Sequence, residues 1–149
     1  MTDDHSAAQE LLSDTALTVF RLNGQVLELA ERLSRPAGLT ATRWQVLGAV
    51  LDAPHTVSDI ARIMGITRQS VQRTADQLEV DGLITYRDNP AHRRAKLVVP
   101  TDSGIDAVRR INDDHRTAAQ ALAERLGVDE WSSIRAALHT LSAALDDTH

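Results

Sequence analysis

A chain of 149 residues with 42% hydrophobic and 25% charged residues is long enough for one compact domain elaborated by extra helices, and its composition argues against disorder. It contains no cysteine, which excludes disulfide bonds, thiolate catalysis and cysteine-based redox sensing. The net charge is −5, yet residues 62–96 hold seven basic and four acidic side chains (+3), which leaves −8 elsewhere; this distribution is compatible with a selective nucleic-acid binder.

The N-terminal residues MTDDHSAAQE are polar and acidic and lack the basic and apolar regions of a signal peptide. No window approaches the roughly 20 apolar residues that a membrane-spanning helix needs. These features predict a cytoplasmic protein.

Residues 7–35 are predicted to form a long amphipathic helix, because apolar residues recur there at three- and four-residue steps. Pro36 and Gly38 end it. Gly24 lies inside this pattern at a cost of about 1 kcal/mol relative to Ala, which a close helix crossing would explain; a break in the helix there is the alternative. The apolar positions are Leu12, Ala16, Val19, Leu22, Val26, Leu29 and Leu33.

Residues 37–100 have the plan of a winged helix-turn-helix. Thr40 or Thr42 caps a helix that stops at residues 52–54, and a short helix over 57–64 is ended by Gly65. The expected buried residues of these two helices are Trp44, Val46, Leu47, Val50, Leu51, Ile60, Ala61 and Met64.

A further helix, capped by Thr67, runs to Val80 and is followed by two strands around a basic loop. The runs Leu83–Arg87 and Leu97–Val99 have strand composition. The expected core positions of the helix are Val71, Ala75 and Leu78.

Two more amphipathic helices complete the chain. The first begins at Thr101 or Ser103 and keeps its helical period to Leu126, and the last carries a heptad-like seam. This seam can pack against the chain's own long helix, but the apolar surface exceeds what residues 37–100 can cover, which favours a two-fold dimer. The sequence thus predicts a mainly α fold with a small β-hairpin wing, flanked by dimerisation helices in residues 1–36 and 101–149. The seam residues are Trp131, Ile134, Leu138, Leu141 and Leu145.

The helix over residues 68–80 carries a polar face whose side chains suit DNA. Arg and Gln pair bidentately with guanine and adenine edges in the major groove, and Ser70 near the helix N-terminus suits a phosphate or base. A solvated surface is the alternative. The basic loop over 88–96 would act as a wing that places an arginine in the minor groove. The candidate DNA-binding residues are Arg68, Gln69, Ser70, Gln72, Arg73, His92, Arg93, Arg94 and Lys96.

Taken together, these motifs resemble the MarR family of bacterial regulators over nearly the whole chain. The resemblance implies a homodimer that binds a pseudopalindromic operator in double-stranded DNA and usually represses transcription. Arg94 matches the family's minor-groove arginine, whereas His92 stands where the family usually has an aspartate that positions it. The matching segments are Leu39-Thr40, Trp44-Gln-Val-Leu47, Thr56-Val-Ser-Asp-Ile-Ala61, Thr67-Arg-Gln-Ser-Val-Gln-Arg73, Leu78-Glu-Val-Asp-Gly-Leu83, Asn89-Pro90, Arg93-Arg94, Pro100-Thr101 and Gly104.

The resemblance also implies release from DNA by a small phenolic or aromatic-acid ligand, bound between the dimerisation helices and the winged module. Candidate ligand-binding residues are Phe20, Arg21, Trp44 and His115, each with a plain core, surface or interface role as the alternative. The six histidines are scattered without ligand spacing, so neither a metal nor another cofactor is predicted.

No catalytic motif is present: the seven glycines are isolated and no histidine stands in a nucleophile motif, so we do not expect an enzyme. The alternative to a DNA-binding repressor is a winged helix that binds proteins. Its signature would be an apolar or acidic outer face on the 68–80 helix. Arg68, Gln69, Gln72 and Arg73 argue against it.

Overall fold

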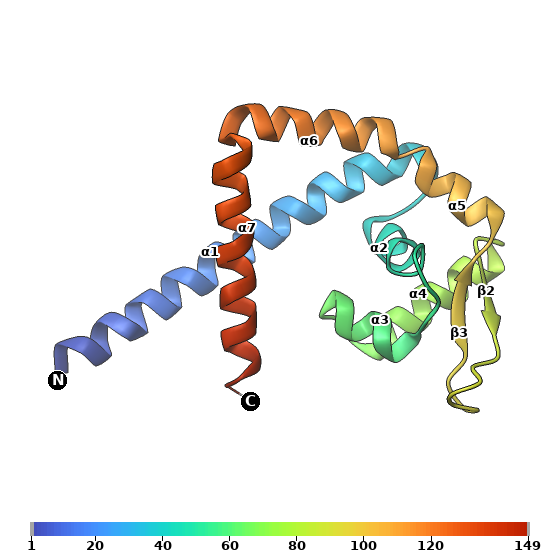
Figure 1. Cartoon of the computed structure of the whole chain (residues 1–149), viewed down its shortest axis with the longest axis horizontal. Coiled ribbons are helices and arrows are strands. Elements are labelled where there is room, and N and C mark those ends of the chain that lie inside the picture. Colours follow the sequence, from blue (N-terminus) through green and yellow to red (C-terminus); the bar gives the residue numbers. More distant parts are fainter. Residues whose placement is uncertain (1, 149) are drawn as a thin grey trace. The chain divides into compact units, whose positions relative to one another are not determined.

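The computed structural model describes residues 2–148, which divide into two compact units on either side of the Ile111–Asn112 bond. The mainly helical fold with a small antiparallel sheet confirms the predicted fold class. Within the first unit, α2, α3 and α4 lie together beside the β2–β3 hairpin (Figure 1). The elements are α1 (Thr2–Ser34), the 3-10 helix η1 (Arg35–Ala37), α2 (Ala41–Ala49), β1 (His55–Thr56), α3 (Val57–Met64), α4 (Arg68–Val80), β2 (Ile84–Arg87), β3 (Leu97–Pro100), α5 (Asp102–Arg109), α6 (Asn112–Leu126) and α7 (Val128–Asp146).

Helix α1 is continuous through Gly24, so the predicted helix is confirmed and the break is ruled out. It begins at Thr2, five residues earlier than predicted. Within the described residues, a Cβ added at Gly24 would meet no atom within 4 Å, so this chain alone does not form the close crossing that would explain the glycine. Pro36 lies in η1, and Gly38 closes that turn with φ 75° by donating its N–H to the Arg35 carbonyl at 2.9 Å.

The core of the first unit is built from the predicted apolar stripes of α2, α3 and α4. Three expectations for this core were wrong: Leu51 lies just beyond α2 and is 40% exposed, and Trp44 and Met64 are only half-buried. Burying a Leu or Ile side chain of this kind contributes about 1.5–3 kcal/mol. The fully buried apolar residues are Val46, Leu47, Val50, Ile60, Val71, Ala75, Leu78, Ile84, Val98 and Ile111.

Threonine hydroxyls define where four of these helices begin. Thr40, Thr56, Thr67 and Thr101 each accept a hydrogen bond from the backbone N–H three residues later, at 3.1–3.2 Å. Each bond pairs an N–H that has no partner inside its helix, a contribution of about 1 kcal/mol per cap. The starts of α2, α3, α4 and α5 are therefore determined within a few residues of sequence.

The sheet has the strand order β1–β3–β2 and is antiparallel throughout. Strands β2 and β3 pair from Ile84 opposite Pro100 to Arg87 opposite Leu97, so residues 88–96 form the hairpin loop. Strand β1 was not predicted, because two residues are too few for an alternating pattern.

The helix predicted to run from residue 101 to Leu126 is broken, and this expectation was wrong. Helix α5 ends at Arg109, and the N–H of Ile111 bonds to the Val108 carbonyl at 3.0 Å in a tighter turn. Asn112, Asp113 and Asp114 then begin α6, because such residues are favoured at helix N-termini. Helix α5 contacts α2 and β3, so it lies with the winged module rather than with the later helices.

The second unit consists of α6 and α7, which contact each other. Its last helix keeps the predicted seam, but much of that seam is uncovered. Ile134, Leu138 and Leu145 are 39%, 41% and 47% exposed, and Trp131 is half-buried. An apolar stripe this exposed indicates a surface that another element can cover.

Candidate functional site

The outward side of α4 carries the side chains that the sequence singled out. Its inward side, Val71, Thr74, Ala75 and Leu78, is buried against the core. Ahead of α4, Gly65 adopts φ 66° and the N–H of Ile66 bonds to the Ala61 carbonyl at 3.1 Å, which sets the turn between α3 and α4. Five of the exposed residues of α4 are here called the reading face: Arg68, Gln69, Gln72, Arg73 and Asp76. Ser70 is also exposed, in the first turn of the helix.

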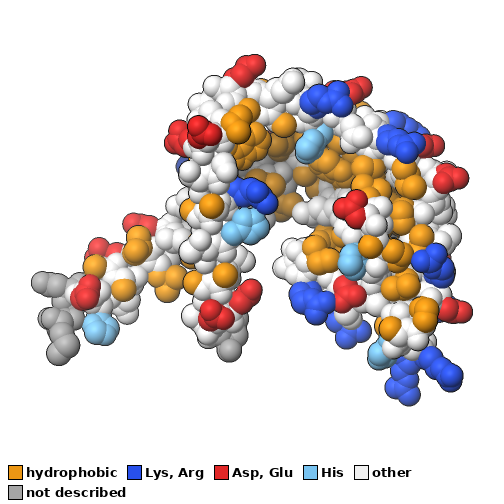
Figure 2. Space-filling model, in the orientation of Figure 1, with side chains coloured by type: hydrophobic (Ala, Val, Ile, Leu, Met, Phe, Trp, Pro, Cys, Tyr) orange, Lys and Arg blue, Asp and Glu red, His pale blue; other side chains and the backbone are white. Residues whose placement is uncertain are grey.

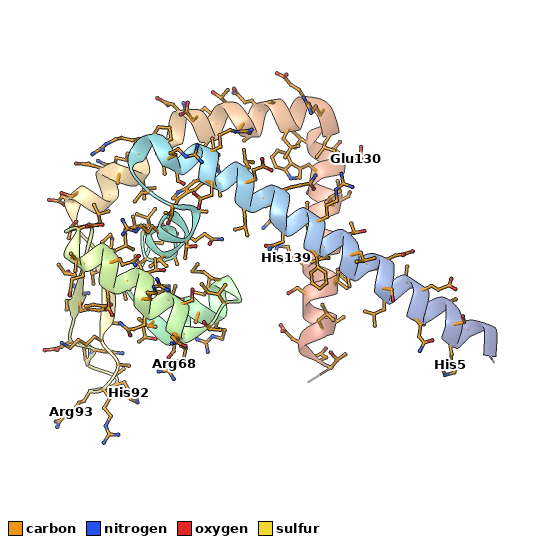
Figure 3. All side chains as sticks on the ribbon, turned by 180° about the vertical axis from the view of Figure 1, so that it is seen from behind. His5, Arg68, His92, Arg93, Glu130 and His139 are labelled. Carbon is orange, nitrogen blue, oxygen red and sulfur yellow. The ribbon has the colours of Figure 1, made fainter. Side chains whose placement is uncertain are left out.

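The wing is the hairpin loop over residues 88–96. Asn89 organises it: its carbonyl accepts from the His92 N–H at 3.2 Å, and its side-chain oxygen accepts from the Ala91 N–H at 3.0 Å. These turns leave His92, Arg93 and Arg94 exposed. Figure 2 shows Lys and Arg side chains gathered at the far end of the hairpin. Figure 3 shows Arg68 on the same side of this unit as His92 and Arg93.

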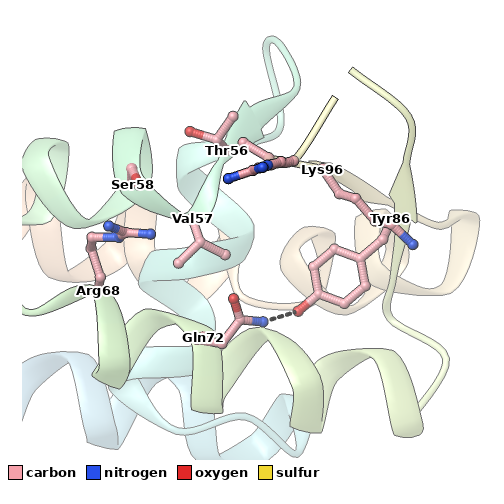
Figure 4. A pocket seen from close by; sticks show the side chains of 9 residues that line it. Thr56, Val57, Ser58, Arg68, Gln72, Tyr86 and Lys96 are labelled. Carbon is pink, nitrogen blue, oxygen red and sulfur yellow. Dashed lines mark hydrogen bonds between the residues drawn. The ribbon is translucent and has the colours of Figure 1, made fainter. Parts of the chain in front are cut away.

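A cleft of about 390 Å³ lies between the start of α3, the reading face and the wing (Figure 4). Arg68, Arg94 and Lys96 bring three positive charges to it, and none of the described residues that line it is acidic. Concentrated positive charge on a concave surface attracts anions such as phosphate groups. The remaining lining residues are Thr56, Val57, Ser58, Gln72, Tyr86 and Ala95.

A closed hydrogen-bond network joins strand β2 to the reading face. The Tyr86 hydroxyl of β2 donates to Asp76 Oδ1 at 2.6 Å, and Gln72 Nε2 donates to Asp76 Oδ1 at 2.9 Å and to Tyr86 Oη at 3.0 Å. Partial burial raises the pKa of the Tyr86 phenol, and the bond to the Asp76 carboxylate raises it further. The phenol therefore stays protonated and keeps its donor role at neutral pH.

The structure brings only some of the predicted residues together. Arg68, Gln72, Arg94 and Lys96 line the cleft, whereas the other five candidates are exposed outside its lining. Sequence reasoning missed Tyr86, the chain's one tyrosine. The available signal was a single tyrosine in the predicted strand that directly follows the polar helix.

Two polar contacts join neighbouring helices of the first unit, one between α2 and α4 and one between α1 and α2. Arg43 Nη1 of α2 lies 2.7 Å from Asp81 Oδ2 at the end of α4, and the half-exposed pair contributes at most about 1 kcal/mol. Glu31 Oε1 of α1 accepts from the N–H of Ala41 at 2.8 Å. The α2 N-terminus is thereby tied to the C-terminal part of α1.

The four candidate ligand-binding residues do not line the cleft. Phe20, 70% exposed, and Arg21 lie on α1, and Trp44 is half-buried on α2. His115 is exposed on α6, in the other unit. Over residues 2–148, no helix is long and apolar enough to cross a membrane, and no three His, Asp or Glu side chains are grouped to hold a metal ion.

Comparison with known sequences finds a match to the MarR family over residues 37–95, which include α2, α3, α4 and most of the wing. The uncharacterized protein Rv2011c of Mycobacterium tuberculosis is 35% identical over 127 residues, which cover 85% of this chain and 89% of that protein.

Solved structures agree with this match. Sco5413, a MarR family transcriptional regulator from Streptomyces coelicolor, superposes with a TM-score of 0.74 at 27% identity, covering 91% of this chain and 96% of that one. The transcriptional repressor CouR, bound to a 23-mer DNA duplex, has a TM-score of 0.76 at 27% identity, covering 88% of this chain and 94% of its own.

Proposed function

Since this chain belongs to the MarR family of transcription regulators, we propose that it is a homodimeric repressor that binds a specific DNA sequence. The observation that carries the proposal is the cleft in which Arg68 of α4 meets Arg94 and Lys96 of the wing. Such a surface can contact base edges through the helix and phosphates through the wing in one docking geometry.

The proposed contacts divide by chemistry. Arg68, Gln69, Gln72 and Arg73 belong to the helix that would enter the major groove, and Ser70 at its first turn would contact a phosphate or base. Arg94 would enter the minor groove, whose negative potential attracts a guanidinium group. His92, Arg93 and Lys96 would contact the backbone. The structure of CouR bound to a DNA duplex supports double-stranded DNA as the partner.

Dimerisation is proposed from the apolar surfaces that each unit leaves uncovered. On α1, Leu11, Leu12 and Leu17 are 61–69% exposed, and on α7 the exposed seam residues around Leu138 are 39–47% exposed. A second copy would cover both surfaces in a two-fold assembly, and the pairing would place two reading faces on a pseudopalindromic site. Sedimentation of the purified chain at several concentrations tests this, and a monomer at micromolar concentration would contradict it.

Control by a small aromatic or phenolic acid is proposed on the same family basis. Phe20 and Trp44 would supply apolar contacts, and Arg21 would supply a cation for a carboxylate. Screening aromatic acids for release of bound DNA tests this proposal. Release that Arg21→Ala leaves unchanged would remove Arg21 from the ligand site.

Fluorescence anisotropy against DNA from upstream of the protein's own gene, with random DNA as control, tests the DNA-binding proposal directly. Arg94→Ala should weaken binding severalfold and lower the log–log salt slope by about one, because one groove contact is lost. Arg109→Ala is the matched control, since it removes one charge from a 72% exposed arginine of α5. Equal losses in the two variants would refute the role of Arg94, and no binding to either DNA at low salt would refute the function.

A further inference from the structure

The reading face of α4 is not a row of independent polar side chains. Gln72 and Asp76 are held in place by Tyr86, which reaches them from β2. Figure 4 shows the Gln72 nitrogen turned toward the Tyr86 hydroxyl and its carbonyl oxygen turned away.

The orientation of the Gln72 amide follows from its neighbours. Asp76 Oδ1 can only accept hydrogen bonds, so the amide atom 2.9 Å from it must be the nitrogen; an amide oxygen there would face a carboxylate oxygen. The Tyr86 hydroxyl gives its single hydrogen to the same carboxylate and receives one from Gln72. The three side chains therefore hold one another in place.

This network decides what the face offers to DNA. Bidentate pairing of Gln72 with adenine needs both its nitrogen and its oxygen at the base edge. Asp76 Oδ1 and Tyr86 Oη, which are 2.6 Å apart, share one N–H of that nitrogen and hold it toward β2. The free end is the carbonyl oxygen Oε1, and the exposed Asp76 carboxylate adds a second acceptor, Oδ2, one helical turn away. The middle of the reading face thus presents acceptors.

We propose that Tyr86 is a specificity-determining residue, which holds Gln72 and Asp76 so that this face selects an adenine or cytosine over a guanine or thymine. Adenine N6 and cytosine N4 are amino donors in the major groove, whereas guanine O6 and thymine O4 are acceptors that would face oxygen with oxygen. The selected position tolerates either amino base and rejects both keto bases. The inference rests on the proposed DNA-binding function.

The test is affinity selection from a pool of DNA duplexes with a randomised core of about 20 base pairs, which holds two half-sites one helical turn apart. Wild type is expected to enrich adenine or cytosine at one position of each half-site. Tyr86→Phe keeps the ring but removes one of the two acceptors that hold the Gln72 nitrogen, so the exposed bond to Asp76 is the amide's remaining restraint in this network. The variant should lower the amino-to-keto ratio there by roughly threefold to tenfold, the effect of one hydrogen bond. Affinity for unselected DNA should be unchanged, because the phosphate contacts remain.

Two further variants make the result specific. Gln72→Ala removes Oε1 but keeps the bond between Tyr86 and Asp76, so it should lose selectivity at the same position. Thr85→Val removes a hydroxyl from the neighbouring, exposed residue of β2 and should leave the selected sequence unchanged.

The outcomes separate the two proposals. An identical motif from wild type and Tyr86→Phe overturns the role of Tyr86 and leaves the DNA-binding proposal standing. Loss of selectivity at every position together with a lower Tm also overturns it, since Tyr86 would then act through the stability of the wing. No motif selected by wild type overturns both.

Discussion

Gly104 is the position where the structure makes the sharpest prediction about stability. A Cβ added there would lie 2.1 Å from the Leu83 carbonyl oxygen and 3.2 Å from Leu47 Cδ2. The same Leu83 oxygen accepts from the Thr101 N–H at 3.0 Å, a bond that joins the end of β3 to the start of β2. Ala at this position must therefore push α5 or that junction aside.

The magnitude follows from three contributions. Overpacking of this kind costs about 1–3 kcal/mol, and loss of the bond between Thr101 and Leu83 costs about 1 kcal/mol. The better helix propensity of Ala offsets about 1 kcal/mol. We expect Gly104→Ala to lower the free energy of unfolding by about 2 kcal/mol and Tm by about 8 °C in a chain of this size.

Thermal unfolding followed by circular dichroism, at one fixed protein concentration, measures this change. Gly48→Ala is the matched control, because Gly48 is an exposed glycine of α2 at which a Cβ would meet nothing within 4 Å. That variant should be as stable as wild type or up to about 1 kcal/mol more stable. Equal Tm values for Gly104→Ala and wild type would refute the close approach of α5 to Leu83.

Three further substitutions test local features of the fold. Thr67→Ala should lower the free energy of unfolding by about 1 kcal/mol in chemical unfolding, since the Ser70 N–H loses its acceptor. Thr67→Ser keeps a hydroxyl and should be as stable as wild type. An unchanged stability of Thr67→Ala would contradict the cap. The hydrogen bond from the Thr56 hydroxyl holds the pKa of Asp59 below its usual value. The charged carboxylate therefore stabilises the folded state at pH values above the usual pKa, and this stabilisation is lost as the pH falls below about 4. The stability difference between wild type and Asp59→Asn should therefore shrink from about pH 5 to pH 2, and a constant difference would refute this. Gly24→Ala should raise Tm by a few degrees, because α1 gains about 1 kcal/mol of helix propensity; a lower Tm with a weaker dimer in sedimentation would mean that a second copy packs against Gly24.

The sequence placed α3 and α4 at their observed residues because their boundaries depend on neighbours within one helical turn. Thr67 bonds to an N–H three residues away, and Gly65 ends α3 with a positive φ that other residues avoid. The exposed side of α4 follows from the spacing of Val71, Ala75 and Leu78.

Helical periodicity could not locate the break at Ile111, because the apolar stripes of α5 and α6 follow each other without interruption in the sequence. Ile111 is 1% exposed, and it is packed in the core of the first unit where the chain turns. Burial against distant residues decides such a turn, and a pattern along one segment does not contain that information.

Sequence by itself determined the helix-turn-helix, the basic wing and which residues of α4 face outward, because these features arise from interactions between residues close together in the chain. Only the tertiary structure decided how those outward residues are used. Gln72 meets Tyr86 fourteen residues away, and Gly104 meets Leu83 because α5 folds back on the start of β2. Both contacts depend on where β2 lies against α4 and α5, and packing of the whole module sets that position.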